Sequence, residues 1–152
     1  MAGQSTQGFW IRFLAALIDG IILQVASFII VLPIAFVLGI AAATSGNADA
    51  ASSLGTGVGV LVSLVVQWIY EAGFLSSAKQ ATPGKMALNL VVTDENGAKI
   101  SFARASGRHF GKYLSALILL IGYLIQPFTA KRQALHDMLA GTLVLVRRPG
   151  QY

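Results

Sequence analysis

The chain has 152 residues, of which 55% are hydrophobic and 11% are charged, and its mean hydropathy is +0.70. Soluble domains contain about 25% charged residues, so this composition excludes an ordinary soluble protein and predicts a single integral membrane domain over residues 1–152. The formal charge of +5 does not indicate nucleic-acid binding, because the basic residues flank apolar runs instead of forming one dense patch. The sequence has no cysteine and two histidines, so we expect no disulfide, thiol chemistry, metal site or cofactor.

The first apolar segment predicts a helix over about residues 9–40, longer than the roughly 20 residues that a membrane span requires. Arg12 and Asp19 interrupt it and, seven residues apart, share one helix face. A charge near the centre of a span costs roughly 2.5 to 3.5 kcal/mol, so each needs a polar partner. Because only Arg12 is long enough to reach the headgroups, we expect Arg12 to be a structural anchor and Asp19 the working group. A cleaved signal peptide is not expected, since no Lys or Arg precedes the run.

A second helix is predicted over about residues 54–75, after a flexible connection over residues 41–56. It carries a stripe of small and polar residues at spacings of four, which places them on one face: Gly55, Gly59, Ser63, Gln67 and Glu71. The small residues permit close helix packing. Gln67 and Glu71 are candidate partners for Arg12 and Asp19, while Glu71 as a marker of the membrane boundary is an equally open alternative.

Alternating apolar residues on either side of Asn96-Gly97 predict a small cytoplasmic β-hairpin over about residues 85–103. The run TLVLV, residues 142–146, predicts a strand that joins the hairpin. Pro83-Gly84-Lys85 is not a phosphate loop, because the upstream glycine is absent and the next residue is Met86 instead of Ser or Thr.

A third hydrophobic segment is predicted over about residues 104–128, followed by a tail over 129–152. Its apolar part, residues 113–128, would form a helix of about 24 Å, short for a hydrocarbon core of about 30 Å. The segment therefore either spans or re-enters the membrane. Lys and Arg are absent from residues 41–53 and frequent in 79–112 and 131–148, which places the N-terminus and the basic loops in the cytoplasm. The predicted fold is all-α, with two full transmembrane helices, this third segment and the small hairpin.

Three motifs together resemble the RDD family of small bacterial membrane proteins, named for one arginine and two aspartates. They are R-x-x-A-x-x-I-D at residues 12–19, TPGK at 82–85 and RQALHDMLAGT at 132–142, which supply Arg12, Asp19 and Asp137. The resemblance covers nearly the whole chain. It implies a protein of the bacterial cytoplasmic (inner) membrane that transports an unidentified ligand, with cation/proton antiport in some members.

Two functions are therefore in competition. In the first, the intramembrane carboxylates Asp19, Asp137 and Glu71 bind either a proton or Na⁺ or K⁺, which couples the two in exchange. In the second, pairing of Arg12 with an aspartate holds a structural or assembly module of a membrane complex together. Both predict a homo-oligomer or a membrane partner protein. An enzyme is not expected, because His136 and Asp137 are adjacent and no Ser or Cys nucleophile motif accompanies them.

Overall fold

The structure, a computed structural model, describes residues 8–118 and 124–147. The chain divides into two compact units. The first, which we call the polar unit, comprises residues 1–19 and 70–152. The second, the helix-pair unit, comprises residues 20–69. Two long helices contribute residues to both units: α1 (Phe9–Ser45) and α2 (Ala48–Ser76).

Both helices extend further into the predicted connection than the sequence indicates, so that only Gly46 and Asn47 separate them. Alanine, the strongest helix former, is frequent here. Hydroxyl side chains bond back to carbonyl oxygens of the preceding turn, as Thr44 Oγ1 does to the carbonyl of Ala41 at 2.9 Å, so these polar residues do not stop the helix. Gly46 ends α1 with a φ of +67°. Asn47 then begins α2, where its Oδ1 accepts from the backbone N–H of Ala50 at 3.3 Å.

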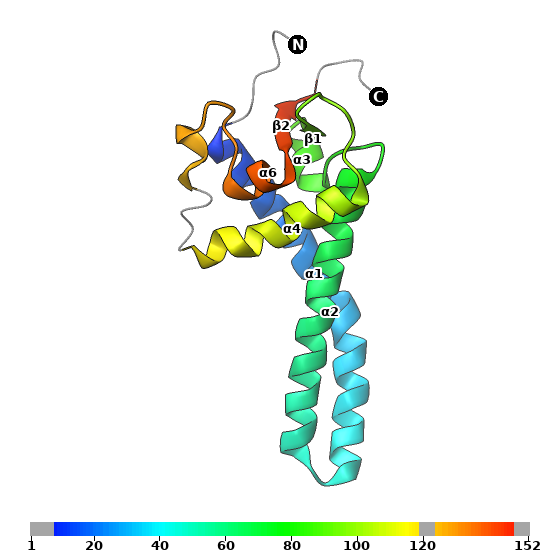
Figure 1. Ribbon diagram of the computed structural model, residues 1–152. Helices are drawn as coiled ribbons and strands as arrows, with labels where there is room; N and C mark the ends of the chain where they lie inside the picture. The colour runs from blue at the N-terminus through cyan, green and yellow to red at the C-terminus, as the bar shows by residue number, and fades with distance from the viewer. Residues whose placement is uncertain (1–7, 119–123, 148–152) are drawn as a thin grey trace. The chain divides into compact units, whose positions relative to one another are not determined.

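Within the helix-pair unit, α1 and α2 run antiparallel side by side (Figure 1). Large apolar side chains on both helices are exposed, among them Phe28 and Phe36 of α1 and Leu61 of α2. A surface of this kind suits lipid and would be a liability in water. Both helices are long and apolar enough to cross a membrane, over Phe9–Thr44 and Asp49–Ser76.

The predicted packing stripe of α2 does not form a tight seam. A Cβ on Gly55 would meet nothing within 4 Å, and one on Gly59 would reach only the side chain of Val31, at 3.6 Å. Gly55, Gly59, Ser63 and Gln67 instead line a cavity of about 710 Å³ between the two helices.

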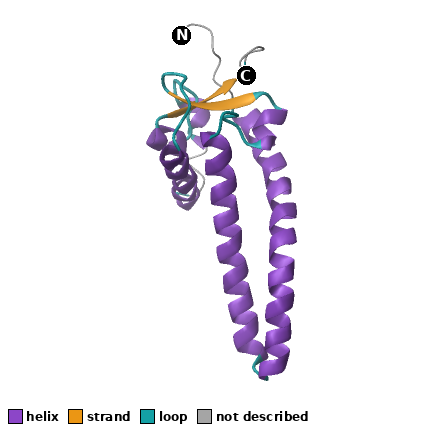
Figure 2. Ribbon diagram, turned by 90° about the vertical axis from the view of Figure 1, so that its right-hand side faces the viewer, coloured by secondary structure: helices purple, strands orange, loops and turns teal. Residues whose placement is uncertain are grey.

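The polar unit contains the shorter elements, which Figure 2 colours by type. They are α3 (Pro83–Ala87), β1 (Leu90–Asp94), α4 (Phe102–Leu117), the 3₁₀ helix η1 (Gln126–Phe128), α6 (Leu135–Ala140) and β2 (Thr142–Val146). Its apolar core includes Leu90, Val92, Ile100 and Val144, each at most 2% exposed. The sheet therefore packs as a small buried layer within this unit.

The two-stranded antiparallel sheet is confirmed, but the predicted hairpin pairing is wrong. Strand β1 pairs with β2, with Leu90 opposite Val146 and Asp94 opposite Thr142. The Asn-Gly turn forms, with Gly97 at a φ of +82°. The chain does not return as a strand after it, because Ser101 Oγ accepts from the N–H of Arg104 at 3.2 Å and starts α4. The C-terminal strand takes the vacant place beside β1, as the TLVLV run predicts.

The third hydrophobic segment is described only in part. Its first half is α4, whose buried side includes Arg108 and His109 and whose exposed side includes Phe110, Leu114 and Leu117. Residues 119–123, in the middle of the predicted segment, lie outside the described residues. Whether the segment spans or re-enters stays a prediction.

Candidate functional site

Three buried carboxylates dominate the polar unit: Asp19 of α1, Glu71 of α2 and Asp137 of α6. None is more than 7% exposed. A buried carboxylate must be paired or well hydrogen-bonded, so the partners of each one define what the site can do.

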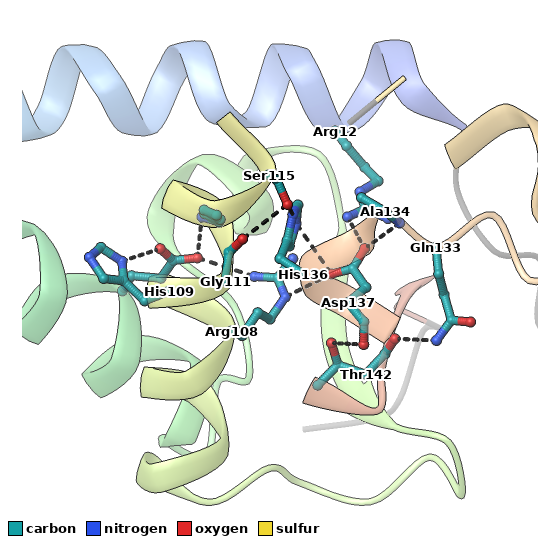
Figure 3. Close-up of polar contacts among 12 residues, drawn as sticks. Arg12, Arg108, His109, Gly111, Ser115, Gln133, Ala134, His136, Asp137 and Thr142 are labelled. Atoms are coloured by element: carbon teal, nitrogen blue, oxygen red, sulfur yellow. Dashed lines mark hydrogen bonds and ion pairs between the residues drawn. The ribbon is translucent and has the colours of Figure 1, made fainter. Parts of the chain in front are cut away.

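Asp137 joins the two arginines that lie nearest to it. Arg12 Nη2 forms an ion pair with Oδ2, and Arg108 Nε donates to Oδ1 at 2.8 Å (Figure 3). Asp137 also accepts from the backbone N–H of Ala134 at 3.2 Å, which caps α6. Burial alone would raise the pKa of the Asp137 carboxyl, but the guanidinium groups of Arg108 and Arg12 outweigh burial and hold this pKa below its ordinary range.

Glu71 is held by three residues of α4. Arg108 Nη1 donates to Oε1 at 3.1 Å, His109 Nδ1 lies 2.8 Å from Oε2, and Lys112 Nζ forms an ion pair with Oε1. Arg108 therefore bridges Glu71 and Asp137. The paired residues lie on α1, α2, α4 and α6, so the network connects these four helices. Removing one partner of a buried ion pair lowers the free energy of unfolding by about 3 to 5 kcal/mol.

Asp19 has a different environment, composed mainly of neutral groups. Tyr70 Oη donates to its Oδ1 at 2.9 Å, the backbone N–H of Gly84 donates to the same atom at 2.7 Å, and Thr82 Oγ1 donates to Oδ2. Asp19 also forms an ion pair with Lys85, whose Nζ lies 3.9 Å from Oδ2.

Lys85 also donates to Thr82 Oγ1, at 3.2 Å, so its ammonium lies against two oxygens of this small site. Burial lowers the pKa of Lys85 to about 7, with a further contribution from the nearby charge of Lys112, although Glu71 opposes it. A lysine with this pKa exchanges its proton near neutral pH. Lys85 is therefore a group of the network whose charge can change near neutral pH.

Glycines allow the close approaches that place these groups. A Cβ on Gly84 would lie 2.3 Å from the carbonyl oxygen of Ala15 and 2.9 Å from the backbone nitrogen of Asp19, so α3 meets α1 backbone to backbone. A Cβ on Gly111 of α4 would lie 3.2 Å from the Cβ of His136 on α6. These close contacts hold the TPGK segment against α1, and α6 against α4.

The structure brings four of the predicted residues into this network: Arg12, Asp19, Glu71 and Asp137. Arg12 pairs with Asp137, one of the two aspartates considered for it. Asp19 instead contacts the TPGK segment, through Thr82 and Gly84, which the sequence did not indicate. Gln67 belongs to the helix-pair unit, where it lines the cavity with Gly55, Gly59 and Ser63.

Sequence reasoning did not assign a role to several residues that the network uses: Tyr70, Thr82, Gly84, Lys85, Arg108, His109, Lys112 and His136. Two signals could have found some of them. The TPGK motif contains three, and Arg108 and Lys112 are four apart on one face of a predicted helix, a basic stripe that needs acidic partners inside a membrane. Among the described residues, no group of three or more His, Cys, Asp or Glu side chains could hold a metal ion.

Comparison with known proteins gives a consistent result. The sequence model of the RDD family matches residues 6–141 of the chain. The protein named "Uncharacterized protein YxaI" of Bacillus subtilis (strain 168) is 35% identical over 147 residues, which cover 92% of this chain and 97% of that protein. A second protein of this organism, "Uncharacterized membrane protein YteJ", is 29% identical over 140 residues, which cover 91% of this chain and 79% of that protein.

No solved structure matches the chain. The name of the second relative and the two long apolar helices support a location in a membrane. The family match extends over all three motifs except the last residue of the third, Thr142. The chain belongs to the RDD family.

Proposed function

We propose that the protein is a small membrane transporter that exchanges protons for a monovalent cation, Na⁺ or K⁺, at the pair formed by Asp19 and Lys85. The observation that carries the proposal is the position of Lys85. Its ammonium lies 3.2 Å from Thr82 Oγ1 and 3.9 Å from Asp19 Oδ2, where a monovalent cation would find a carboxylate and a hydroxyl oxygen as ligands. The ammonium of Lys85 thus occupies a position where a metal cation of the same charge, +1, could bind.

The exchange balances one proton against one cation. When Lys85 loses its proton, Asp19 keeps a negative charge that the hydroxyls of Tyr70 and Thr82 do not neutralise. A Na⁺ or K⁺ ion then binds to the carboxylate and to the lone pair on Thr82 that the ammonium had used. Protonation of Lys85 restores its positive charge beside Asp19, and this charge displaces the bound ion. A pKa of about 7 for Lys85, lowered chiefly by burial, lets this step respond to pH near neutrality.

The proposal includes an orientation and an assembly. The excess of Lys and Arg in residues 79–112 and 131–148 favours the cytoplasmic side for these segments and for the N-terminus, in the bacterial cytoplasmic membrane. The two candidate spans in the described part of the chain leave many of their large apolar side chains exposed. We therefore infer that several copies assemble to form the pathway, which crosslinking in membranes would test.

The test is ion flux in proteoliposomes that contain the purified full chain and a trapped pH indicator. A Na⁺ or K⁺ gradient should change the internal pH with wild-type protein. Asp19→Asn should abolish the response. Lys85→Arg should abolish it too, because arginine keeps its proton at all physiological pH values. Lys99→Arg, the same change at an exposed lysine, should leave the response intact.

Folding of each variant is checked by its thermal unfolding in detergent. A folded Asp19→Asn or Lys85→Arg protein with normal exchange would refute the mechanism, and an inactive wild-type protein would refute transport of these ions.

A structural role is the second candidate, and the bridge from Arg12 through Asp137 and Arg108 to Glu71 favours it. In this role the protein holds a membrane complex together and moves no ion. Arg12→Asp and Asp137→Arg should then each abolish assembly, and the double variant should regain it, with no flux in any of them. Flux through the wild-type protein would exclude this function as the complete explanation.

A further inference from the structure

A cavity of about 160 Å³ lies in the polar unit, and its charged lining is of one sign. Four basic side chains line it, from α1, α3 and α4, together with the amide of Gln126: Arg12, Lys85, Arg108 and Lys112. None of the residues that the structure describes along this cavity is acidic. The volume is that of several water molecules, at about 30 Å³ each in the liquid, which is enough for a phosphate group.

The three carboxylates of the network contact these cations without lining the cavity. Four cationic side chains face Asp19, Glu71 and Asp137, which leaves one excess positive charge when all are ionised. None of the three carboxylates is among the described residues that line the cavity, so an occupant meets the cations first. The side chains of Arg12 and Lys85 are each 11% exposed, so water screens their field weakly.

The titration behaviour of two lining residues is consistent with a positive field. The pKa of Lys85 is lowered to about 7, first by burial and then by the charge of Lys112. Burial lowers the pKa of His136 to about 3; Asp137 opposes this shift, and Arg108 adds to it. A bound anion would offset both effects, because it favours the charged form of each group.

We propose that this cavity binds a phosphate group, either as inorganic phosphate or as the headgroup of an anionic phospholipid. Clustered Arg and Lys side chains in a poorly hydrated site are the groups with which proteins hold phosphate, through charge-assisted hydrogen bonds. The remaining lining residues come mainly from the lipid-compatible helix α1, among them Phe13 and Ala16, both exposed. A phosphate on the basic side and an acyl chain on this apolar side would suit a phospholipid.

The proposal does not depend on ion exchange, and its test is a binding measurement. In the first arm, inorganic phosphate is titrated into the purified full chain in a zwitterionic detergent, against chloride at equal ionic strength, and the rise in Tm gives the affinity. In the second arm, the Tm is measured in nanodiscs of phosphatidylcholine alone and in nanodiscs that contain phosphatidylcholine and phosphatidylglycerol in equal amounts. The expected result is stabilisation in at least one arm; the first arm identifies free phosphate and the second a lipid headgroup.

Lys112→Met tests the site itself, since Lys112 is the most exposed of the four cations and the least confined by the network. It should weaken binding at least about tenfold, the factor that corresponds to about 1.4 kcal/mol. Lys112→Arg should restore binding. Lys99→Met removes the same charge from an exposed position and should leave binding unchanged. Ala16→Phe fills the cavity from its apolar side without removing a charge and should also weaken binding, which keeps the test valid if Lys112→Met does not fold.

Absence of stabilisation by both phosphate and phosphatidylglycerol would overturn the proposal. An equal loss with Lys112→Met and Lys99→Met would do so as well, because it would show attraction to the net charge of the protein instead of to this cavity.

Discussion

Replacing Asp137 by asparagine tests whether the buried ion pairs hold the polar unit together. The change keeps the shape of the side chain and an oxygen that can accept from the N–H of Ala134, but it removes the charge that Arg12 and Arg108 share. The side chain of Asp137 is fully buried and that of Arg108 is 2% exposed. Two guanidinium groups would therefore lose their buried counter-charge at once.

The expected loss of stability is about 3 to 5 kcal/mol, the cost of removing one partner from a buried ion pair. For a chain of 150 to 250 residues, each kcal/mol lowers Tm by about 2 to 4 °C, which predicts a decrease of roughly 6 to 20 °C for Asp137→Asn. The measurement is thermal unfolding of the purified protein in detergent, followed by far-UV circular dichroism.

Glu95→Gln is the matched control, because Glu95 pairs with Lys131 at 2.8 Å and both side chains are more than half exposed. An exposed pair of this kind contributes at most about 1 kcal/mol. If Asp137→Asn lowers Tm no more than Glu95→Gln does, the buried network does not stabilise the polar unit.

Two further predictions concern the backbone contact at α3 and the response to acid. Gly84→Ala should strongly lower Tm and the yield of folded protein, since the new Cβ would lie 2.3 Å from the carbonyl oxygen of Ala15. Gly107→Ala is the control, because a Cβ at Gly107 has open space around it and should be neutral or slightly stabilising. Equal Tm values for the two variants would contradict the close contact. Stability should fall as the pH decreases from about 6.5 towards 3, by at most about 1.4 kcal/mol per pH unit, because the unfolded chain protonates His136 at its ordinary pKa while burial lowers this pKa to about 3 in the folded protein. Thermal unfolding from pH 7 to 4 measures the slope, and His136→Asn should flatten it. If the slope is unchanged in His136→Asn, the loss above pH 4 comes from another group. Below pH 3.8 a second loss of stability should follow, since the folded protein holds the pKa of Asp137 below its ordinary value and the unfolded chain does not.

The two long helices could be predicted because a run of apolar residues is a local property. Their ends at the connection between them could not, since the alanine, serine and threonine residues after residue 40 are compatible with either a loop or a helix. Back-bonded hydroxyls such as that of Thr44 and the left-handed Gly46 decide between them. The predicted hairpin partner of β1 was wrong for a related reason. The Asn-Gly turn is real, but a strand needs a partner, and the capped start of α4 removes the local one.

The sequence by itself determined that this is a membrane protein of the RDD family, and that Arg12 and Asp19 require polar partners. Those conclusions follow from composition and from motifs, which do not depend on contacts. Only the tertiary structure decided which charge meets which. Arg12 and Asp19 share a helix face, yet Arg12 pairs with Asp137, 125 residues away, and Asp19 with the segment that contains Lys85. A helix periodicity reports the direction of a side chain, whereas its partner depends on how distant segments fold onto that face.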